Sequence, residues 1–347
     1  MWFAQLRRHL EFKEIYQMAT STIPSVGRSI KANEQQPSKL PRPLRGMIPP
    51  MLTPLAFDKA GNEQVDIAGL ERLIEHILGG GVHGLFILGS TGEGPSLSER
   101  FKRELIEQSA RIVNRRVPLL VGITDSSFTD SLALAAHAAA AGADAVVCTS
   151  PFYFPISDAE HLAYFRKLNS QLPLPLFLYN MPGLTKVRFA LDVIKALRDE
   201  PNVVGLKDSS GDMAYFKSAL EIAAGRPDWT MLVGPERLLT DVVAAGAHGG
   251  VCAEANLHPQ LLVELYDAAV ARDAGRISAA RSKMAKLLQL YQLQTNIGRP
   301  GIAPLKAALA YLGICQDQTA PPLVPLDPSH RGAVQEIVNE LGLTRSI

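Results

Sequence analysis

The amino-acid sequence predicts an α/β fold, a (β/α)₈ TIM barrel followed by a C-terminal helical appendix. From residue 46 onward, eight short apolar runs alternate with longer segments of helical periodicity. Continuous apolar runs are typical of strands that are buried on both faces, as in a parallel sheet. Eight strand–helix units favour a closed barrel, and the first run lacks the glycine-rich phosphate turn of an open, doubly wound sheet.

The predicted strands and helices follow this alternation in order. The apolar runs predict strands over residues 47–52, 84–88, 118–123, 145–149, 174–179, 203–207, 230–234 and 249–252. The segments between and after them predict helices over 65–78, 98–113, 130–141, 158–170, 191–197, 212–224, 235–245 and 259–272. The first helix has apolar residues at spacings of three and four on one face, namely Ile67, Leu70, Leu73, Ile74 and Ile77. The second is predicted to begin at an N-cap, Ser96, with Glu99 three residues later in capping-box register.

The chain divides into three parts by composition. Residues 1–45 carry eight basic and three acidic side chains, and residues 21–45 are polar with several prolines, which predicts a basic, disordered extension. An organelle-targeting presequence and a start at Met18 are the alternatives for this segment. Residues 46–273 form the predicted barrel. Residues 274–347 predict the appendix, with helices over 275–294, 301–312 and 331–341 and no ninth strand.

The composition and net charge limit the kinds of binding partner and compartment that we expect for this protein. Apolar residues make up 47% of the chain and charged residues 20%, which is typical of a globular protein with a sizeable core. The net charge of +1 gives no general attraction to nucleic acid or an acidic membrane, and no apolar run reaches the roughly 18 residues that span a bilayer. The three cysteines (Cys148, Cys252, Cys315) form no CxxC pair, so a reducing compartment, the cytoplasm, is expected.

Lys207 is the residue at a strand end that most directly indicates chemistry. Barrel active sites lie at the carboxyl ends of the strands, and Lys207 follows the apolar run of residues 203–206. Desolvation there disfavours the ammonium form and leaves an amine that can attack a carbonyl carbon. The resulting iminium withdraws electrons from the adjacent carbon. An ordinary ion-paired lysine is the alternative at such a position.

Hydroxyl groups follow two other predicted strands. Tyr179 ends the strand before that of Lys207 and can carry a proton to or from a substrate, although a rim aromatic is the alternative. Ser90 and Thr91 offer two hydroxyls and backbone N–H groups between flanking glycines, which suits a small carboxylate.

Other kinds of site are not indicated. The glycine-rich segment at residues 89–94 lacks the Gly-Lys-Ser/Thr ending of a nucleotide-binding P-loop. The eight histidines show no metal-ligand spacing, and no carboxylates have calcium-binding or two-metal spacing. The sequence therefore predicts neither a metal nor a cofactor.

Three ordered motifs resemble those of the dihydrodipicolinate synthase/N-acetylneuraminate lyase superfamily. They are Gly-Ser-Thr-Gly-Glu at 89–93, Tyr-Asn-x-Pro at 179–182 and Gly-Leu-Lys-Asp at 205–208, and the resemblance extends over residues 45–343. It implies that Lys207 forms a Schiff base with a 2-oxo acid such as pyruvate and that Tyr179 relays protons. It also implies that Ser90 links Tyr179 to solvent or substrate and that Thr91 helps to bind the carboxylate.

The same resemblance implies an assembly and further pocket residues. Tyr153 is similar to a family tyrosine that enters a neighbouring subunit's site, which implies a homodimer or homotetramer. Val251 matches an apolar position of the pyruvate pocket. Residues 207–209, which include Ser209, and residues 249–253 are also similar to 4-hydroxy-2-oxoglutarate aldolases and to 2-keto-3-deoxy sugar acid aldolases or dehydratases. Gly234 ends the seventh predicted strand and is a further candidate pocket residue.

Departures from the family pattern restrict the substrate. Leu184 stands where dihydrodipicolinate synthases usually carry an arginine for a second carboxylate, which disfavours that reaction. Glu236 and Arg237 replace the acidic pair that binds sugar hydroxyls in sialic-acid lyases, and Arg237 either meets a second substrate carboxylate or forms an ordinary ion pair. An aldolase that releases pyruvate from a 4-hydroxy-2-oxo or 2-keto-3-deoxy acid is the leading hypothesis. A 2-keto-3-deoxy sugar acid dehydratase and a non-catalytic sensor barrel are the alternatives.

Overall fold

A parallel sheet of eight strands forms the centre of the protein. The computed structural model describes residues 40–294 and 301–344, so the expected extension up to residue 39 lies outside the described residues. The strands are β1 (Gly46–Met47), β4 (Leu85–Ile87), β5 (Leu119–Gly122), β6 (Ala145–Thr149), β7 (Leu176–Asn180), β8 (Val203–Asp208), β9 (Thr230–Val233) and β10 (Gly249–Gly250). Their order is β1-β10-β9-β8-β7-β6-β5-β4. A parallel bridge between Pro50 and Phe86 joins the two ends of this order. The predicted closed barrel is confirmed.

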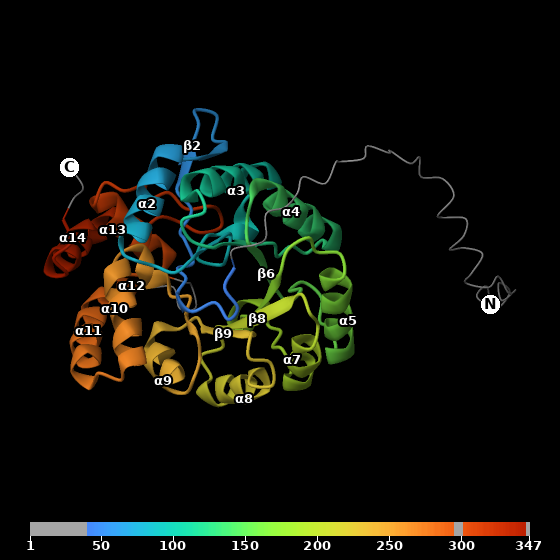
Figure 1. The fold of residues 1–347 in the computed structure, drawn as a ribbon. Helices are drawn as coiled ribbons and strands as arrows, with labels where there is room; N and C mark the ends of the chain where they lie inside the picture. The colour runs from blue at the N-terminus through green and yellow to red at the C-terminus, as the bar shows by residue number, and fades with distance from the viewer. Residues whose placement is uncertain (1–39, 295–300, 345–347) are drawn as a thin grey trace, which may run out of the picture. The chain divides into compact units, whose positions relative to one another are not determined.

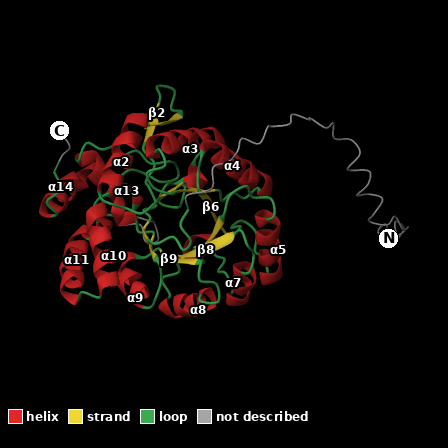
Figure 2. Ribbon diagram, viewed as in Figure 1, coloured by secondary structure: helices red, strands yellow, loops and turns green. Residues whose placement is uncertain are grey.

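Helices surround the strands, as Figures 1 and 2 show. They are α2 (Ile67–Gly79), α3 (Glu99–Val113), α4 (Phe128–Ala141), α5 (Asp158–Asn169), α7 (Leu191–Arg198), α8 (Met213–Ala223), α9 (Leu239–Ala244) and α10 (Pro259–Ala271). The predicted apolar face of α2 is buried except at Ile67, which is 38% exposed because it begins the helix and lies at its rim.

One local expectation needs correction, and one local element was not predicted. The cap of α3 is Ser98 and not Ser96, because the Oγ of Ser98 accepts a hydrogen bond from the N–H of Phe101. Ser96 ends a short 3₁₀ helix, η1 (Gly94–Ser96), and so lies too early to cap α3. An antiparallel hairpin, β2 (Leu55–Phe57) and β3 (Glu63–Val65), was not predicted, since its three-residue strands are too short for a clear alternation.

Further helices follow α10 in the part of the chain that the structure describes. They are α11 (Ala274–Leu287), α12 (Gln289–Gln292), α13 (Ile302–Tyr311) and α14 (Arg331–Glu340). Helix α11 packs against α10, and α13 packs against α14, so these helices lie on one side of the barrel (orange to red in Figure 1). Within the described residues no helix is both long and apolar enough to span a bilayer.

Residues 40–45 of the expected extension pack against the barrel. Leu40 and Leu44 are buried in the same cluster as the interior side chains Ile48 and Leu232. The N–H of Leu44 donates to the Oγ1 of Thr230, the first residue of β9, at 2.9 Å. These leucines therefore cover the amino-terminal end of the strands and leave the carboxyl end for a site.

This packing predicts the effect of shortening one side chain. Leu44→Ala should lower the free energy of unfolding by about 2–5 kcal/mol, because it removes buried methyl groups and leaves a cavity. Val270→Ala on α10, where Val270 is 57% exposed, is the control and should change it by less than about 0.5 kcal/mol. Urea unfolding measures both values. Equal values for the two variants would mean that residue 44 does not pack as described.

Candidate active site

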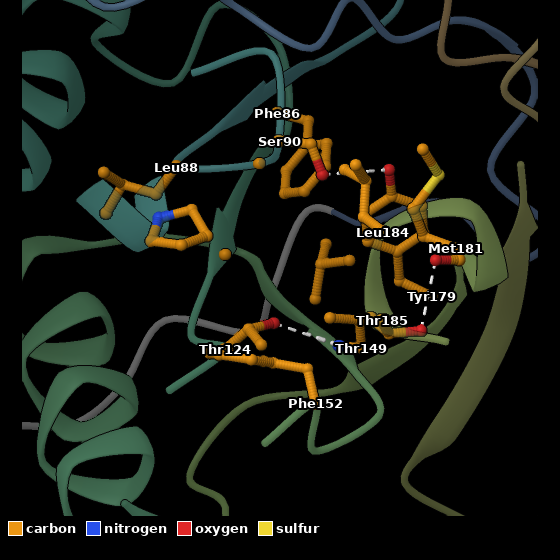
Figure 3. Close-up of a pocket in the computed structure, with 14 residues that line it drawn as sticks. Phe86, Leu88, Ser90, Thr124, Thr149, Phe152, Tyr179, Met181, Leu184 and Thr185 are labelled. Atoms are coloured by element: carbon orange, nitrogen blue, oxygen red, sulfur yellow. Dashed lines mark hydrogen bonds between the residues drawn. The ribbon is translucent and has the colours of Figure 1, made fainter. Parts of the chain in front are cut away.

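A cavity of about 250 Å³ opens at the carboxyl ends of β4 to β7. Figure 3 shows side chains from these strand ends pointing into it. Its lining combines apolar groups with hydroxyls and contains no charged side chain among the described residues. The principal lining residues are Phe86, Leu88, Ser90, Thr124, Val147, Thr149, Phe152, Tyr179, Met181, Leu184 and Thr185. A mostly apolar pocket with a few convergent polar groups is the usual form of a small-molecule site.

Lys207 lies against two aromatic rings that line this cavity. Residues Tyr179 on β7 and Lys207 on β8 are partners in the parallel register. The Nζ of Lys207 is 4.0 Å from the centroid of the Tyr179 ring and 5.0 Å from that of Phe86. Lys207 is only 5% exposed, yet none of the ion pairs formed by the described residues includes it. The alternative of an ordinary ion-paired lysine therefore finds no support.

Tyr179 has neighbours that favour its ionised form. Its Oη lies 3.3 Å from the Oγ of Ser90, and Figure 3 shows the two groups pointing toward each other. Burial raises the pKa of the Tyr179 phenol, but the charge of Lys207 and hydrogen bonds with Ser90 and Ser209 outweigh burial, so that the pKa lies below its ordinary value. A phenol with a lowered pKa exchanges protons more readily near neutral pH.

The loop of residues 89–94 presents Ser90 and Thr91 at the end of β4. Its turn is closed by hydrogen bonds from the N–H of Glu93 to the carbonyl of Ser90 and from the N–H of Gly94 to that of Gly89. Within the described chain, no backbone carbonyl accepts from the N–H groups of Ser90 and Thr91. Since buried N–H groups need an acceptor, these two are available to a ligand carboxylate.

Glycine is required in this loop by close backbone contacts. A Cβ at Gly94 would lie 2.3 Å from the carbonyl oxygen of Leu88, and one at Gly92 would lie 2.8 Å from that of Met51. These two glycines therefore let the loop fold tightly against the strand ends, with Ser90 in the lining of the cavity and Thr91 next to it in the chain.

Asn180 and Asp208 fix the ends of β7 and β8. The Nδ2 of Asn180 donates to Asp208 at 2.7 Å, and both the N–H and the hydroxyl of Ser210 also donate to Asp208. Burial raises the pKa of Asp208, and the hydrogen bonds from Asn180 and Ser210 oppose that rise. These motif residues hold the strand ends that carry Tyr179 and Lys207.

Three other predicted positions, residues 251, 234 and 184, lie in different surroundings. Val251 is 4% exposed and belongs to the barrel-interior cluster that includes Tyr179. A Cβ at Gly234 would lie 2.0 Å from the Oγ of Ser209, so glycine there leaves room for that hydroxyl beside Tyr179. Leu184 lines the cavity and is 42% exposed.

Of the predicted site residues, only Ser90, Tyr179 and Leu184 are among those that line the cavity. Lys207 lies behind the lining, against the rings of Tyr179 and Phe86.

Two other predicted residues are at exposed positions. Arg237 is exposed and donates from Nη2 to the carbonyl of Gly211 at 2.9 Å. Tyr153 is 76% exposed and contacts the ring of Phe154, which is 72% exposed. The expected entry of Tyr153 into a neighbouring subunit stays a prediction.

Sequence reasoning missed two hydroxyls and one buried carboxyl. Thr124 and Thr149 follow or end predicted strands, and that position alone could have identified them. Glu254 lies in η3 (Ala253–Asn256), directly after β10, and accepts a hydrogen bond from the Oη of Tyr291 at 2.5 Å. Burial, followed by the negative charge of Glu236, raises the pKa of Glu254 to about 7. Glu236 and Glu254 lie in two separate segments, after β9 and after β10, so their spacing along the chain could not show that the two carboxyls interact.

Three comparisons with known proteins agree on one group of enzymes. The model of the Dihydrodipicolinate synthetase family matches residues 43–341. A 4-hydroxy-tetrahydrodipicolinate synthase of Phenylobacterium zucineum is 31% identical over 299 residues, which are 86% of this chain and 98% of that protein. The putative 2-dehydro-3-deoxy-D-gluconate aldolase YagE of Escherichia coli is 31% identical over 301 residues, 86% of this chain and 97% of its own. The solved dihydrodipicolinate synthase from Bacteroides thetaiotaomicron is 43% identical with a TM-score of 0.81, and the match covers 86% of this chain and 99% of that one.

The raised pKa of Glu254 predicts a pH-dependent stability. A carboxyl that binds its proton more tightly in the folded state loses stabilisation as the pH rises from its unfolded value of 4.5 to its folded value of about 7. Glu254→Gln keeps the acceptor for Tyr291 and removes this dependence. It should therefore gain about 3 kcal/mol of unfolding free energy relative to the parent between pH 4.5 and pH 8.

Urea unfolding at the two pH values checks this prediction. Glu71→Gln, at an exposed position on α2, serves as the control and should show no such difference. If Glu254→Gln changed the unfolding free energy by the same amount at both pH values, the carboxyl would have an ordinary pKa.

Proposed function

The chain belongs to the dihydrodipicolinate synthetase family, and we propose that it is a lyase that binds a 2-oxo acid as a Schiff base on Lys207. In the proposed reaction, a 4-hydroxy-2-oxo acid or a 2-keto-3-deoxy acid is cleaved to pyruvate and an aldehyde, or is formed from them. The observation that carries the proposal is the buried amine of Lys207, which lies 4.0 Å from the ring centroid of Tyr179 and outside the ion pairs of the described residues.

The proposed first step joins Lys207 to the substrate. The Nζ lone pair attacks the C2 carbonyl carbon to give a carbinolamine, which loses water to form an iminium ion. The iminium is the electron sink for cleavage: when the C3–C4 bond breaks, its electron pair moves toward nitrogen and forms an enamine. Protonation of C3 and hydrolysis of the resulting iminium then release pyruvate and restore the amine.

Tyr179 is the proposed proton carrier for these steps. Its phenolate accepts the proton of the C4 hydroxyl as the C3–C4 bond breaks and the aldehyde carbonyl forms. The lowered pKa of Tyr179 supports this role, since the phenolate is the form that accepts. Ser90, 3.3 Å from the phenol oxygen, relays the proton toward the cavity.

The substrate carboxylate is proposed to bind at Ser90 and Thr91. Their N–H groups meet no backbone acceptor among the described residues, and hydrogen bonds from N–H and hydroxyl groups to a carboxylate are stronger than those to a neutral acceptor. Val251 belongs to the same buried apolar cluster as the cavity residues Phe86, Val147 and Tyr179, and this cluster suits the methyl or methylene group of the pyruvate part.

The lining of the cavity supports an aldehyde without a second carboxylate. Leu184 extends into the space where the resemblance leads one to look for an arginine, and the lining residues of the described chain carry no charge. The name of the relative YagE, a putative 2-dehydro-3-deoxy-D-gluconate aldolase, agrees with this choice. The hydroxyls of Thr124 and Thr149 are suited to hydrogen-bond a hydroxylated aldehyde, whereas that of Thr185 is bonded to the backbone of Met181 and Val187.

The dihydrodipicolinate synthase reaction is the second candidate, because relatives at 31% and 43% identity carry that name or its synonym. An assay with pyruvate and either aspartate semialdehyde or a short hydroxylated aldehyde separates the two. Faster pyruvate consumption with the hydroxylated aldehyde supports the aldolase, whereas faster consumption with aspartate semialdehyde supports the synthase.

We also propose that the active form is a dimer or tetramer. Tyr153 and Phe154 are 76% and 72% exposed on the loop that follows β6. Two such aromatic side chains, adjacent to the cavity residue Phe152, are typical of an interface core.

Lys207→Ala should abolish covalent capture of pyruvate and turnover, since no other group supplies the attacking amine. Borohydride reduction in the presence of pyruvate, followed by peptide mass spectrometry, should show an adduct on Lys207 of the parent and none on the variant. Lys217→Ala, at an exposed position on α8, should behave as the parent. An adduct elsewhere, or none on the parent, would refute the assignment.

Tyr179→Phe should lower kcat about 10²–10⁴-fold, the range expected for the loss of a positioned proton carrier. Steady-state pyruvate release measures it. Tyr266→Phe, on α10 beside His83, is the control and should keep the parent's kcat. A change in KM alone would make Tyr179 a binding residue.

A further inference from the structure

Glu93 lies in the loop that carries Ser90 and Thr91 but is directed away from the cavity. Its side chain is fully buried, forms an ion pair with Lys306 on α13, and accepts a hydrogen bond from the N–H of Ala320 at 2.6 Å. Glu93 has a backbone φ of 57°, in the left-handed region that is costly for a residue with a Cβ. Glycine would adopt this φ at lower cost, so the backbone conformation does not explain why a glutamate stands at this position.

Lys306 completes the contact from outside the barrel. Its side chain is also fully buried, and its Nζ donates to the carbonyl of Gln318 at 2.6 Å in addition to pairing with Glu93. Burial lowers the pKa of Lys306, and the charge of Glu93 opposes that change. Both charges therefore have several partners, which is the condition for keeping a charge pair inside a protein.

The neighbouring strand end is tied to the same loop. The Oγ1 of Thr53 donates to the carbonyl of Gly92 at 2.6 Å, and the N–H of Leu52 donates to the Oδ1 of Asn256 at 2.8 Å. The loop is thus fixed on one side by the hydrogen bond from Thr53, and on the other by the ion pair with Lys306 and the hydrogen bond from the N–H of Ala320. Glu93 and Lys306 are the contact through which α13 reaches it.

We propose that Glu93 and Lys306 are a positioning pair that sets the affinity of the site for the substrate carboxylate. The pair keeps the N–H and hydroxyl groups of Ser90 and Thr91 aimed at the cavity, although neither charge touches the substrate. This inference rests on the proposed function, in which those two residues bind the carboxylate of the 2-oxo acid. The helices beyond the barrel are then part of the binding apparatus.

A purely structural ion pair would have different consequences. Lys207 and Tyr179 are held on β8 and β7 by their own register and by Asn180, so loss of the pair leaves the capturing amine in place. A positioning pair therefore affects the concentration of pyruvate needed for capture, whereas a structural pair affects thermal stability alone.

The test uses the double variant Glu93→Gln/Lys306→Met in the full chain. It removes both buried charges while keeping side-chain length, so that no unpaired charge remains. Borohydride trapping of Lys207 is measured against pyruvate concentration. The half-saturating concentration should rise about 10-fold, the loss of roughly one hydrogen bond to a charged group, and the yield at saturation should match the parent's.

The matched control removes an ion pair at the other end of the barrel. Arg226 pairs with Asp228, shortly before β9, and donates to the carbonyls of Glu200, before β8, and of Val203, the first residue of β8. Arg226→Met/Asp228→Asn should lower the thermal unfolding midpoint and leave the half-saturating pyruvate concentration unchanged.

The outcomes distinguish a failure of the proposed function from a failure of the positioning role of Glu93 and Lys306. If the parent is not trapped by pyruvate, the proposed function fails and the role of the pair fails with it. If the parent is trapped and the double variant has the parent's half-saturating concentration, only the positioning role is overturned. If the control variant shows the same 10-fold rise, the effect follows lost stability and the positioning role is also overturned.

Discussion

The parallel register of β7 and β8 is the constraint on which the site depends. It places Tyr179 beside Lys207, and successive residues of a strand point to opposite faces. A slip of one residue would therefore turn the amine out of the barrel and toward the surrounding helices. The hydrogen bond from Asn180 to Asp208, at the next pair along the two strands, fixes this register where the site begins.

Two buried lysines show how surroundings assign different roles to one side chain. Lys306 is enclosed with Glu93 and the carbonyl of Gln318, so its ammonium group has an ion-pair partner and a hydrogen-bond acceptor inside the protein. Lys207 is nearly as buried, but its Nζ lies over the rings of Tyr179 and Phe86 and forms a hydrogen bond with the Tyr179 phenol in place of an ion pair. Aromatic faces attract a cation more weakly than a carboxylate does. Lys207 therefore loses less favourable interaction energy than a carboxylate-paired lysine would when its amine reacts with a ketone.

Features set by the local sequence were predictable, and features set by distant contacts were not. The eight apolar runs located the strands, and positions at strand ends singled out Lys207, Tyr179 and Ser90, whose side chains the structure places close together. The pairing of Glu93 with Lys306 joins residues far apart in the chain, so no local pattern indicates it. The same holds for Glu254 and Tyr291. The error at the cap of α3 arose from two serines with equal capping ability, between which only the backbone decides.

The distribution of charged side chains at the carboxyl end of the barrel bears on how a bound substrate would be oriented. The charged side chains Glu236, Arg237 and Glu254 follow β9 and β10, whereas the cavity beside β4 to β7 is lined by apolar groups and hydroxyls. In the proposed mechanism, the carboxylate lies at the end of β4 and the carbonyl carbon lies at Lys207. The aldehyde part then extends along the side that includes Leu184 and the threonines, where moving a second carboxylate out of water would have no compensating cation. An uncharged, hydroxylated aldehyde meets no such penalty, and this difference in desolvation is the physical reason for proposing the aldolase ahead of the synthase.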